Sequence, residues 1–352
     1  MTTRPSSLQI WSTCPATRTD HAPERPGFYA EAGEAFRRRV ADVARWSEAA
    51  GCRGSLIYID NSLPDNWALA QILIEATRHQ VPLIATQPAY MHPYWAAKQI
   101  TSLGHLYDRP VALNMLAGAF RNDLLALNDP TPHDRRYDRM VEYTELIYRL
   151  LEGRPVTYEG EFYQARGLTL HPPLDASLRP ELLMSGSSPA AMAAARRLGA
   201  VAVRYPKPVA FYEEHPLEPD IRFGLRIGIV AREDEAAAWE AARERFPEDR
   251  KGQIAHRMAM KTSDSSWHKQ LSALDEEELS DAFPYWLTPF RNYKTFCPYL
   301  VGTYDRLASI VARYVRVGFR VFITDIPVRD DDLRHQQEVF RRVEVLLRAD
   351  PA

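Results

Sequence analysis

The stretch ELLMSGSSPAAMAAARRLG, residues 181–199, decides the fold class. Its apolar run Leu182-Leu183-Met184 predicts a buried strand, and the small residues that follow predict a tight turn. Ser188 and Pro189 suit the cap and the first position of a helix that Gly199 ends. Unpaired backbone N–H groups and the positive end of the helix dipole favour an anion there, most often a phosphate. We therefore expect a strand–turn–helix unit with a phosphate site at its turn.

The same alternation of apolar runs and helical periods continues along the chain. Helices are predicted over Tyr137–Leu151, Pro189–Leu198 and Asp305–Val317, each closed by a glycine. Strands are predicted over Leu8–Ser12, Gly54–Asp60, Val81–Gln87, Pro110–Met115, Glu181–Ser185, Ala200–Arg204, Arg222–Arg232 and Phe319–Asp325. Eight strands alternating with helices favour an α/β fold of the (β/α)8 TIM-barrel type over an open doubly wound sheet. We predict a single such domain over residues 1–352.

Two stretches exceed what a barrel of this kind needs. Arg154–Pro180 predicts a hairpin around Gly160, with strands at Val156–Tyr158 and Phe162–Tyr163, before the fifth strand. A longer insertion, about 250–300, separates the seventh and eighth strands. It is dense in aromatic residues, namely Trp267, Phe283, Tyr285, Trp286, Phe290, Tyr293, Phe296 and Tyr299. Such insertions usually form lids or binding walls, and the alternative here is a subunit-packing element.

Composition excludes several classes of protein. Hydrophobic residues make up 45% and charged residues 26% of the chain, which is typical of a globular protein with a substantial core. A net charge of -2 gives no electrostatic case for nucleic acid. No apolar run approaches the ~20 residues needed to cross a bilayer, and the N-terminus lacks a secretion signal. Three widely spaced cysteines form no metal motif or disulfide framework, so we expect a cytoplasmic location.

Small or neutral polar residues predominate where the predicted strands end. Asp60 follows the second strand, Asn114 ends the fourth, and Ser187 and Ser188 follow the fifth. Catalytic groups in barrels sit at these strand ends. The sequence offers no carboxylate pair, no metal-ligand constellation and no Gly-x-Ser-x-Gly motif. Such a polar site without an acid, base or metal suits chemistry supplied by a cofactor.

The order of these segments resembles the bacterial-luciferase-like flavin monooxygenases, nearest to the alkanesulfonate monooxygenase branch. The matching pieces are Asp65 and Trp67, Ala85-Thr86-Gln87-Pro88, Asn114-Met115-Leu116-Ala117-Gly118, His133-x-x-Arg136-Tyr137, Tyr158-x-Gly160, Gly167, Pro172-Pro173, Ser185–Ser188, Phe223-Gly224-Leu225-Arg226, Arg232-Glu233, Leu300-Val301-Gly302 and Gly318-Phe319-x-x-Phe322. Their collinear order from the second strand to the last helix carries the resemblance.

The resemblance implies a cofactor and its partners. Reduced FMN would react with O2 to give a C4a-(hydro)peroxyflavin, which oxygenates an organic small molecule such as a biosynthetic intermediate. Enzymes of this kind generally receive FMNH2 from a separate NAD(P)H:flavin reductase, and this chain has no Gly-rich NAD(P) fingerprint of its own. The family also forms dimers and tetramers, so we expect a homodimer or a homotetramer.

The resemblance also implies which residues would hold the flavin. By matched position, the FMN phosphate would be held by Ser187, Ser188 and Tyr137. The ribityl chain and ring would lie along Asn114, His133 and the Ala117 backbone, with Asp60 facing the flavin. Arg226, within the seventh strand, would assist oxygen transfer.

The chain departs from the sulfonate enzymes at the positions that grip a sulfonate. Leu63 replaces a Cys, Gly228 a His, and Ile326 a Tyr, while Tyr293, with Arg291 nearby, stands where the mobile loop has an Arg. An organosulfonate substrate is therefore not expected, and a larger or more apolar one is. The predicted substrate and lid residues are Leu63, Trp286, Arg291, Tyr293 and Ile326.

The residues also allow other interpretations. Tyr137 could pack beneath the hairpin, and Asp60 could cap the segment after it. Arg226 could bind an anionic substrate group, stabilise a peroxyflavin anion or pair with an acidic residue. Some relatives bind the deazaflavin F420 and transfer hydride, and others bind flavin without turnover. An aldolase is disfavoured because no Lys ends a strand to form a Schiff base.

Overall fold

Eight parallel strands close into a barrel in the order β10-β9-β6-β5-β4-β1-β14-β11, and β11 pairs back with β10. The computed structural model describes residues 8–17, 28–29, 33–118, 121–262 and 285–349. The barrel strands are β1 (Gln9–Thr13), β4 (Gly54–Ile57), β5 (Val81–Thr86), β6 (Ala112–Met115), β9 (Glu181–Ser185), β10 (Val201–Arg204), β11 (Arg222–Arg232) and β14 (Phe319–Thr324). All eight predicted strands are present, and the predicted (β/α)8 barrel is confirmed.

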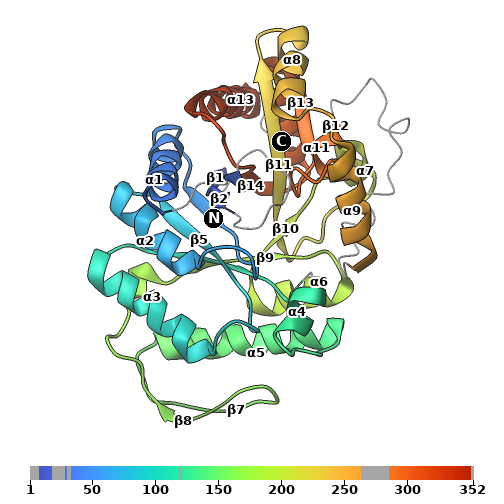
Figure 1. The fold of residues 1–352 in the computed structure, drawn as a ribbon. Helices are drawn as coiled ribbons and strands as arrows, with labels where there is room; N and C mark the ends of the chain where they lie inside the picture. The colour runs from blue at the N-terminus through green and yellow to red at the C-terminus, as the bar shows by residue number, and fades with distance from the viewer. Residues whose placement is uncertain (1–7, 18–27, 30–32, 119–120, 263–284, 350–352) are drawn as a thin grey trace.

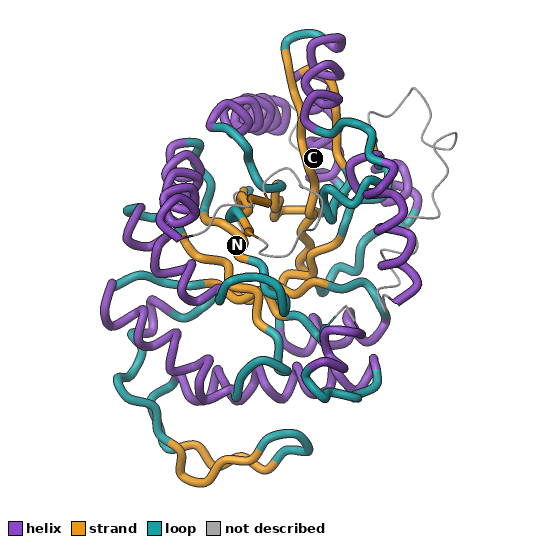
Figure 2. Tube along the Cα trace, in the orientation of Figure 1, coloured by secondary structure: helices purple, strands orange, loops and turns teal. Residues whose placement is uncertain are grey.

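Helices surround the strands on the outside of the barrel (Figures 1 and 2). The helices among the described residues, of which α9 and α11 belong to the insertion, are α1 (Gly33–Ala49), α2 (Asn66–Ala76), α3 (Pro93–Tyr107), α4 (Arg121–Ala126), α5 (His133–Leu151), α6 (Pro189–Leu198), α7 (Val209–Glu214), α8 (Glu235–Arg245), α9 (Arg250–Thr262), α11 (Thr288–Arg291), α12 (Tyr304–Arg316) and α13 (Asp330–Ala349), with the 3-10 turn η1 (Ala176–Leu178). Of the predicted helices, Pro189–Leu198 has the observed bounds, and Asp305–Val317 is displaced by one residue. The third begins at His133, four residues before the predicted Tyr137.

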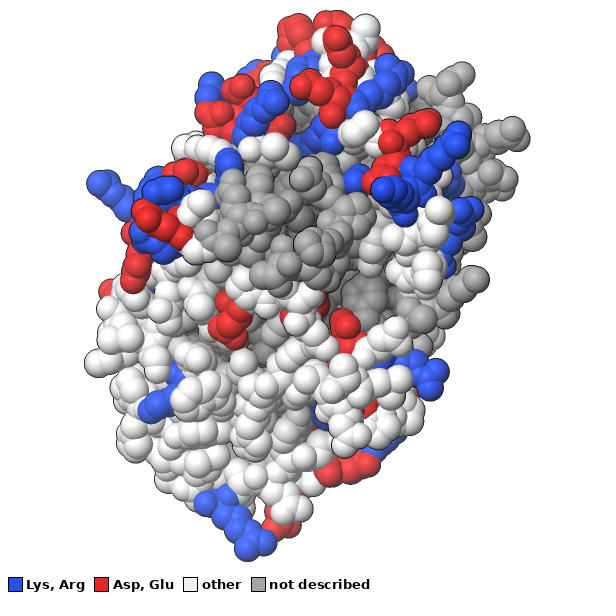
Figure 3. Space-filling model, in the orientation of Figure 1, with Lys and Arg blue, Asp and Glu red and all other residues white. Residues whose placement is uncertain are grey.

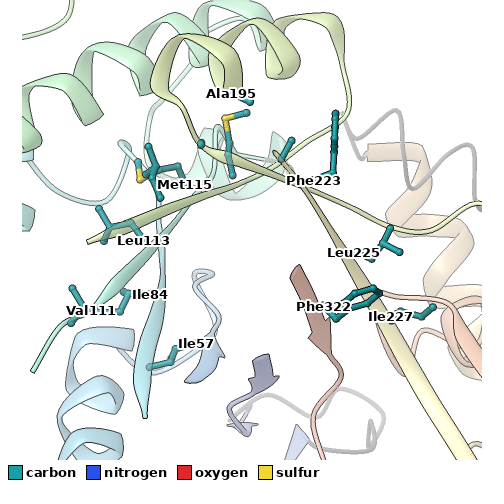
Figure 4. Close-up of a cluster of buried hydrophobic side chains, with 14 of the residues drawn as sticks. Ile57, Ile84, Val111, Leu113, Met115, Ala195, Phe223, Leu225, Ile227 and Phe322 are labelled. Carbon is teal, nitrogen blue, oxygen red and sulfur yellow. The ribbon is translucent and has the colours of Figure 1, made fainter. Parts of the chain in front are cut away.

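Two apolar layers form on the two faces of the barrel wall, because side chains alternate along each strand. The inner layer fills the barrel with bulky residues, including Trp11, Leu56, Leu83, Leu183 and Ile323. The outer layer packs against the helices, and Figure 4 shows part of it, including Ile57, Ile84, Leu113, Phe223 and Phe322. Burial of each large side chain stabilises the fold by about 1.5–3 kcal/mol. The barrel is therefore a packed core, which leaves its strand ends for function.

A hairpin precedes β9, as predicted. Its antiparallel strands are β7 (Val156–Glu159) and β8 (Gln164–Leu168), and the Gly160 N–H donates to the Tyr163 carbonyl at 2.9 Å. The second strand begins at Gln164, two residues after the predicted start. Another short pair, β2 (Ala16–Thr17) and β3 (Phe28–Tyr29), is parallel. In Figure 1 the β7–β8 hairpin lies at the bottom of the molecule, beyond α5.

The large insertion joins the barrel through β11, which is long enough to pair with barrel strands at its start and with a strand of the insertion at its end. Its first part pairs with β10 and β14 in the barrel, and residues 228–232 pair with β13 (Tyr299–Thr303). β13 in turn pairs antiparallel with β12 (Tyr285–Trp286). Backbone hydrogen bonds therefore fix the insertion to a barrel strand. Trp267 and Phe283, two of the aromatics noted above, lie outside the described residues.

Candidate functional site

Polar side chains at the C-terminal strand ends face the interior of the barrel. Leu225 and Ile227 pack outward against the helices, so Arg226 between them points inward. Ile323 belongs to the inner layer, and Asp325, two residues later, continues its face. Strand alternation thus brings an arginine and a carboxylate together at one end of an otherwise apolar barrel.

The phosphate turn predicted after β9 is compact and has a tyrosine above it. Gly186 has φ of +152°, and a Cβ at this position would lie 2.8 Å from the Tyr137 hydroxyl oxygen and 2.9 Å from the Ala191 Cβ. Only glycine leaves room for the phenol here. Ser188 caps α6 by accepting a hydrogen bond from the Ala191 N–H at 3.2 Å, and Pro189 follows at the first helical position. The predicted strand–turn–helix unit is confirmed.

Tyr137 and His133 approach this turn from the first turns of α5. Burial raises the pKa of Tyr137, an effect partly opposed by its hydrogen bond with Ser188 and the charge of Arg136. The phenol therefore stays protonated at neutral pH and can donate. The His133 ring centre lies 5.3 Å from that of Tyr137, and its Nδ1 is 2.8 Å from Asp134 Oδ1. The structure thus brings together residues predicted from separate parts of the chain, and their contact with a flavin stays a prediction.

The other predicted flavin residues lie at neighbouring strand ends. Asn114 is 4% exposed, and its Oδ1 accepts a hydrogen bond from the Ser185 hydroxyl at 3.1 Å. Ala117 is buried in the loop after β6, and Ser187 is half-buried in the phosphate turn. Asp60 Oδ1 accepts hydrogen bonds from the backbone N–H and the hydroxyl of Ser62, each at 2.7 Å. Asp60 therefore caps the turn that follows it, as the alternative interpretation held, and its role toward a flavin is untested.

Arg226 is part of a buried polar cluster. Its Nη2 lies 3.3 Å from Asp325 Oδ1, and it also donates to the Tyr58 hydroxyl. The Arg226 guanidinium stands over the Tyr58 ring, 4.8 Å from its centre, as in a cation–π contact. Asp325 Oδ2 accepts hydrogen bonds from Thr295 Oγ1 at 2.5 Å and from the Tyr299 hydroxyl at 2.8 Å. Of the roles considered for Arg226, pairing with an acidic residue is therefore present in the structure.

Gly228 makes this cluster sterically possible. A Cβ on Gly228 would lie 2.3 Å from carbon atoms of the Tyr299 ring, so no other residue fits without displacing that ring. Burial raises the pKa of Tyr299 far above its ordinary value, which keeps the phenol protonated as a donor to Asp325. The position where the sulfonate enzymes carry a His is thus occupied by a tyrosine ring from the insertion.

The remaining predicted substrate and lid residues take different places. Leu63 is half-buried in the turn after β4, and Ile326 is 2% exposed, with its carbonyl accepting a hydrogen bond from Arg245 at 2.6 Å. Tyr293, at φ +56°, and the half-buried Arg291 belong to the segment that follows β12. Trp286 packs against α8, with its ring centre 5.7 Å from that of Trp239.

Four residues of the site have no role assigned in the sequence prediction: Tyr58, Thr295, Asp325 and Tyr299, the last of which stands there only among the aromatic residues of the insertion. Strand alternation would have pointed to two of them, because Tyr58 follows Leu56 and Asp325 follows Ile323 on the interior face. Thr295 and Tyr299 belong to the insertion, whose segment 285–300 forms a wall against Asp325.

Among the described residues, no group of three or more His, Cys, Asp or Glu side chains could hold a metal ion. No described helix is both long and apolar enough to span a membrane.

Comparisons with known proteins agree with this architecture. A family model described as luciferase-like monooxygenase matches residues 19–320. The chain is 33% identical over 312 residues to the 4-(gamma-L-glutamylamino)butanoyl-[BtrI acyl-carrier protein] monooxygenase BtrO of Niallia circulans, which covers 86% of this chain and 91% of BtrO.

Solved structures with the same fold include enzymes of different chemistry. Riboflavin lyase RcaE, crystallised with modified FMN and riboflavin, aligns with a TM-score of 0.74 at 16% identity, over 98% of this chain and 92% of that one. An F420-dependent secondary alcohol dehydrogenase aligns with a TM-score of 0.61 at 16% identity, over 96% and 99% of the two chains. At these identities the structural likeness concerns the fold alone. The family model and the extensive match to BtrO place the chain in the luciferase-like monooxygenase family.

Proposed function

We propose that this monooxygenase uses FMNH2 and O2, receives its reduced flavin from a separate reductase, and oxygenates an acyl group carried on an acyl-carrier protein. The observation that supports flavin binding best is the turn of Gly186 and Ser188 with the Tyr137 hydroxyl above it. The carrier-bound substrate class is suggested by the name of the relative BtrO.

The phosphate turn suits the phosphate of FMN. Unpaired N–H groups at the start of α6 and the hydroxyls of Ser187, Ser188 and Tyr137 are donors of the kind that a phosphate requires. Asn114 and His133 would face the ribityl chain and ring. When bound, the reduced flavin supplies the reaction with O2, and the protein supplies orientation and exclusion of water.

The buried cluster at Arg226 supports a substrate whose reacting end is polar and uncharged. Because Asp325 balances the guanidinium charge, a second anion placed beside this pair would be repelled by the carboxylate. Arg226 Nε and Nη1 are buried and have no hydrogen-bond partner among the described residues. They can donate to a carbonyl oxygen, such as that of a thioester or an amide. An organosulfonate does not suit this arrangement.

The wall formed by segment 285–300 supports a reaction shielded from water. Thr295 and Tyr299 bond to Asp325, and the Phe296 ring meets the Tyr58 ring at a centre distance of 6.1 Å. Aromatic and hydrogen-bonded side chains therefore enclose Arg226 on the insertion side. Exclusion of water would protect the oxygen chemistry that a bound flavin supplies from side reactions.

Anaerobic titration with FMNH2, followed by O2 and measurement of oxygen consumption, tests the flavin part of this proposal. Saturable binding of FMNH2 is expected, with oxygen incorporated into a carrier-bound acyl substrate and detected by mass spectrometry with 18O2. Tight binding of F420H2 without oxygen uptake would instead indicate hydride transfer. Binding of flavin with no product from any carrier-bound acyl group would leave a non-catalytic flavin protein.

A further inference from the structure

One exposed face of α9 is basic and contains no acidic residue. The helix reads RKGQIAHRMAMKT, and Arg250, Lys251 and Arg257 are all exposed. Between them lie Ile254, 51% exposed, and Met258, 65% exposed. The spacing of residues 250, 254, 257 and 258 puts them on a single face of the helix. We name these five residues the α9 face.

The cations of the α9 face are not used within the described part of the chain. The structure gives Arg250, Lys251 and Arg257 no carboxylate within ion-pair distance among the described residues. Elsewhere, exposed arginines commonly pair, as Arg313 does with Glu213 and Arg334 with Asp330. On the face shown in Figure 3, charges of both signs are interspersed near the top of the molecule, over α8 and α13. The α9 face differs from that region because all its charged residues are basic and they surround two exposed apolar side chains.

The opposite side of α9 is anchored to the functional site. A Cβ on Gly252 would lie 2.0 Å from the Asn292 carbonyl oxygen, so the helix approaches α11 closely. His256 is buried, and its ring contacts those of Phe290 and Tyr293 at centre distances of 4.7 and 6.0 Å. Ring contacts then continue from Tyr293 to Phe296 and from Phe296 to Tyr58, which bonds to Arg226. α9 therefore packs on the wall formed by segment 285–300, whose inner side reaches Arg226, and the α9 face lies on the opposite side of the helix.

We propose that the α9 face is the docking surface for an acidic helix of the carrier protein that delivers the substrate. This inference rests on the proposed function, and it adds where the partner binds. The argument is charge complementarity: three cations surround two apolar anchors, which suits an acidic helix with a small apolar patch. A membrane surface suits it less, because interfacial helices bury a broad apolar face with large aromatic or leucine residues. Among the described side chains of α9, the large apolar ones that are exposed are Ile254 and Met258, which is too small a surface for such insertion.

The first experiment measures binding of the phosphopantetheinylated acyl-carrier protein BtrI, used as the probe, to the full chain at low salt by fluorescence anisotropy. The triple variant Arg250→Glu, Lys251→Glu, Arg257→Glu should weaken the Kd at least ~10-fold, because reversed charges repel an acidic partner. In the matched control, Glu replaces Arg37, Arg38 and Arg45 on α1, which lies on the other side of the molecule in Figure 1. This charge reversal should change the Kd less than ~2-fold. Raising the salt should weaken wild-type binding and leave the α9 triple variant nearly unaffected.

A second variant, Ile254→Gln with Met258→Gln, separates apolar contact from charge. It should weaken carrier binding while leaving the salt dependence as in the wild type. Three outcomes would each overturn the proposal. The α9 and α1 triple variants could change the Kd equally, the wild type could fail to bind the carrier, or the wild type could bind phosphatidylserine vesicles in place of the carrier.

Turnover of a free pantetheine thioester distinguishes failure of this inference from failure of the proposed function. The α9 triple variant should oxygenate the free thioester at the wild-type rate and lose activity only on the carrier-bound form. Oxygenation of both forms at wild-type rates by this variant would refute the docking surface and leave the monooxygenase proposal standing. Carrier binding through α9 without oxygenation of either form would refute the proposed activity alone.

Discussion

Arg226 and Asp325 form an ion pair at 3.3 Å, with side chains only 7% and 9% exposed, at the C-terminal end of the barrel. They come from β11 and from the residue after β14, two strands that are adjacent in the sheet. A buried pair of this kind carries no net charge. The second carboxylate oxygen of Asp325, Oδ2, accepts hydrogen bonds from Thr295 and Tyr299. The pair therefore fixes both the charge of the site and the position of the insertion.

Replacing Asp325 with Asn should destabilise the protein by about 3–5 kcal/mol, because the Arg226 charge would remain buried without its counter-ion. Urea unfolding measures this change. The double variant Arg226→Met, Asp325→Asn removes both charges and should recover at least ~1 kcal/mol of the loss. A double variant less stable than the single variant would contradict an uncompensated charge as the cause.

The same Asp325→Asn variant should gain affinity for anions, because the freed guanidinium can pair with a sulfonate. Octanesulfonate should raise the Tm of the variant in a concentration-dependent way and leave that of the wild type unchanged. Arg226→Met, Asp325→Asn provides the control and should not respond. Equal Tm shifts in all three proteins would place the anion elsewhere.

Gly228→Ala tests the close approach of Tyr299 to β11. The added methyl group would overlap a ring at 2.3 Å, so we expect a loss of about 1–3 kcal/mol in the free energy of unfolding. Adding Tyr299→Leu should relieve the overlap, and the combined loss should be less than the sum of the two single losses. Additive losses would show that Gly228 and Tyr299 do not constrain one another.

Tyr137→Phe should weaken FMN binding by roughly 5- to 10-fold, the cost of about one hydrogen bond. Fluorescence quenching of the flavin provides the Kd. Tyr143→Phe on the same helix is the matched control, because the Tyr143 hydroxyl is buried and has no hydrogen-bond partner among the described residues. It should leave the flavin Kd unchanged. An unchanged Kd for Tyr137→Phe would remove Tyr137 from the phosphate site.

Buried thiols should make the protein less stable in alkali. Burial raises the pKa of Cys14 from about 9 to about 12. Between these values the unfolded chain releases a proton that the native protein retains, so the free energy of unfolding falls as pH rises above about 9. Urea midpoints at pH 7 and pH 10.5 measure the slope, and Cys14→Ala should reduce it. An identical slope in the variant would assign the effect to other groups.

Local signals in the sequence were sufficient for much of the fold. The bounds of α6 follow from Ser188, Pro189 and Gly199, which cap and end the helix through their own backbone chemistry. The periodic segment Tyr137–Leu151 leaves out the first turn of α5, because all four residues from His133 to Arg136 are polar and carry no apolar period. The predicted second strand extended to Asp60, whereas β4 ends at Ile57, because an apolar run does not reveal where the ladder of hydrogen bonds stops.

The site was less predictable, because its residues meet only through the tertiary fold. The turn at Ser188 was found from its sequence, and Tyr137 from its position relative to a known family. The partner of Arg226 is 99 residues away in sequence, and no local pattern joins them. Thr295 and Tyr299 reach Asp325 only because β13 pairs with β11, a long-range contact that side-chain periodicity does not encode.

β11 is one continuous strand with two successive sets of neighbours. Arg226 lies in the part enclosed by the barrel, and Gly228, two residues later, already pairs with the insertion. The strand that holds the Arg226 guanidinium is therefore the same strand to which the insertion is joined by backbone pairing. A carrier protein that docks on α9 would therefore bind an element packed on the insertion that β11 joins to the barrel. Substrate delivery and the position of Arg226 would then depend on the same strand.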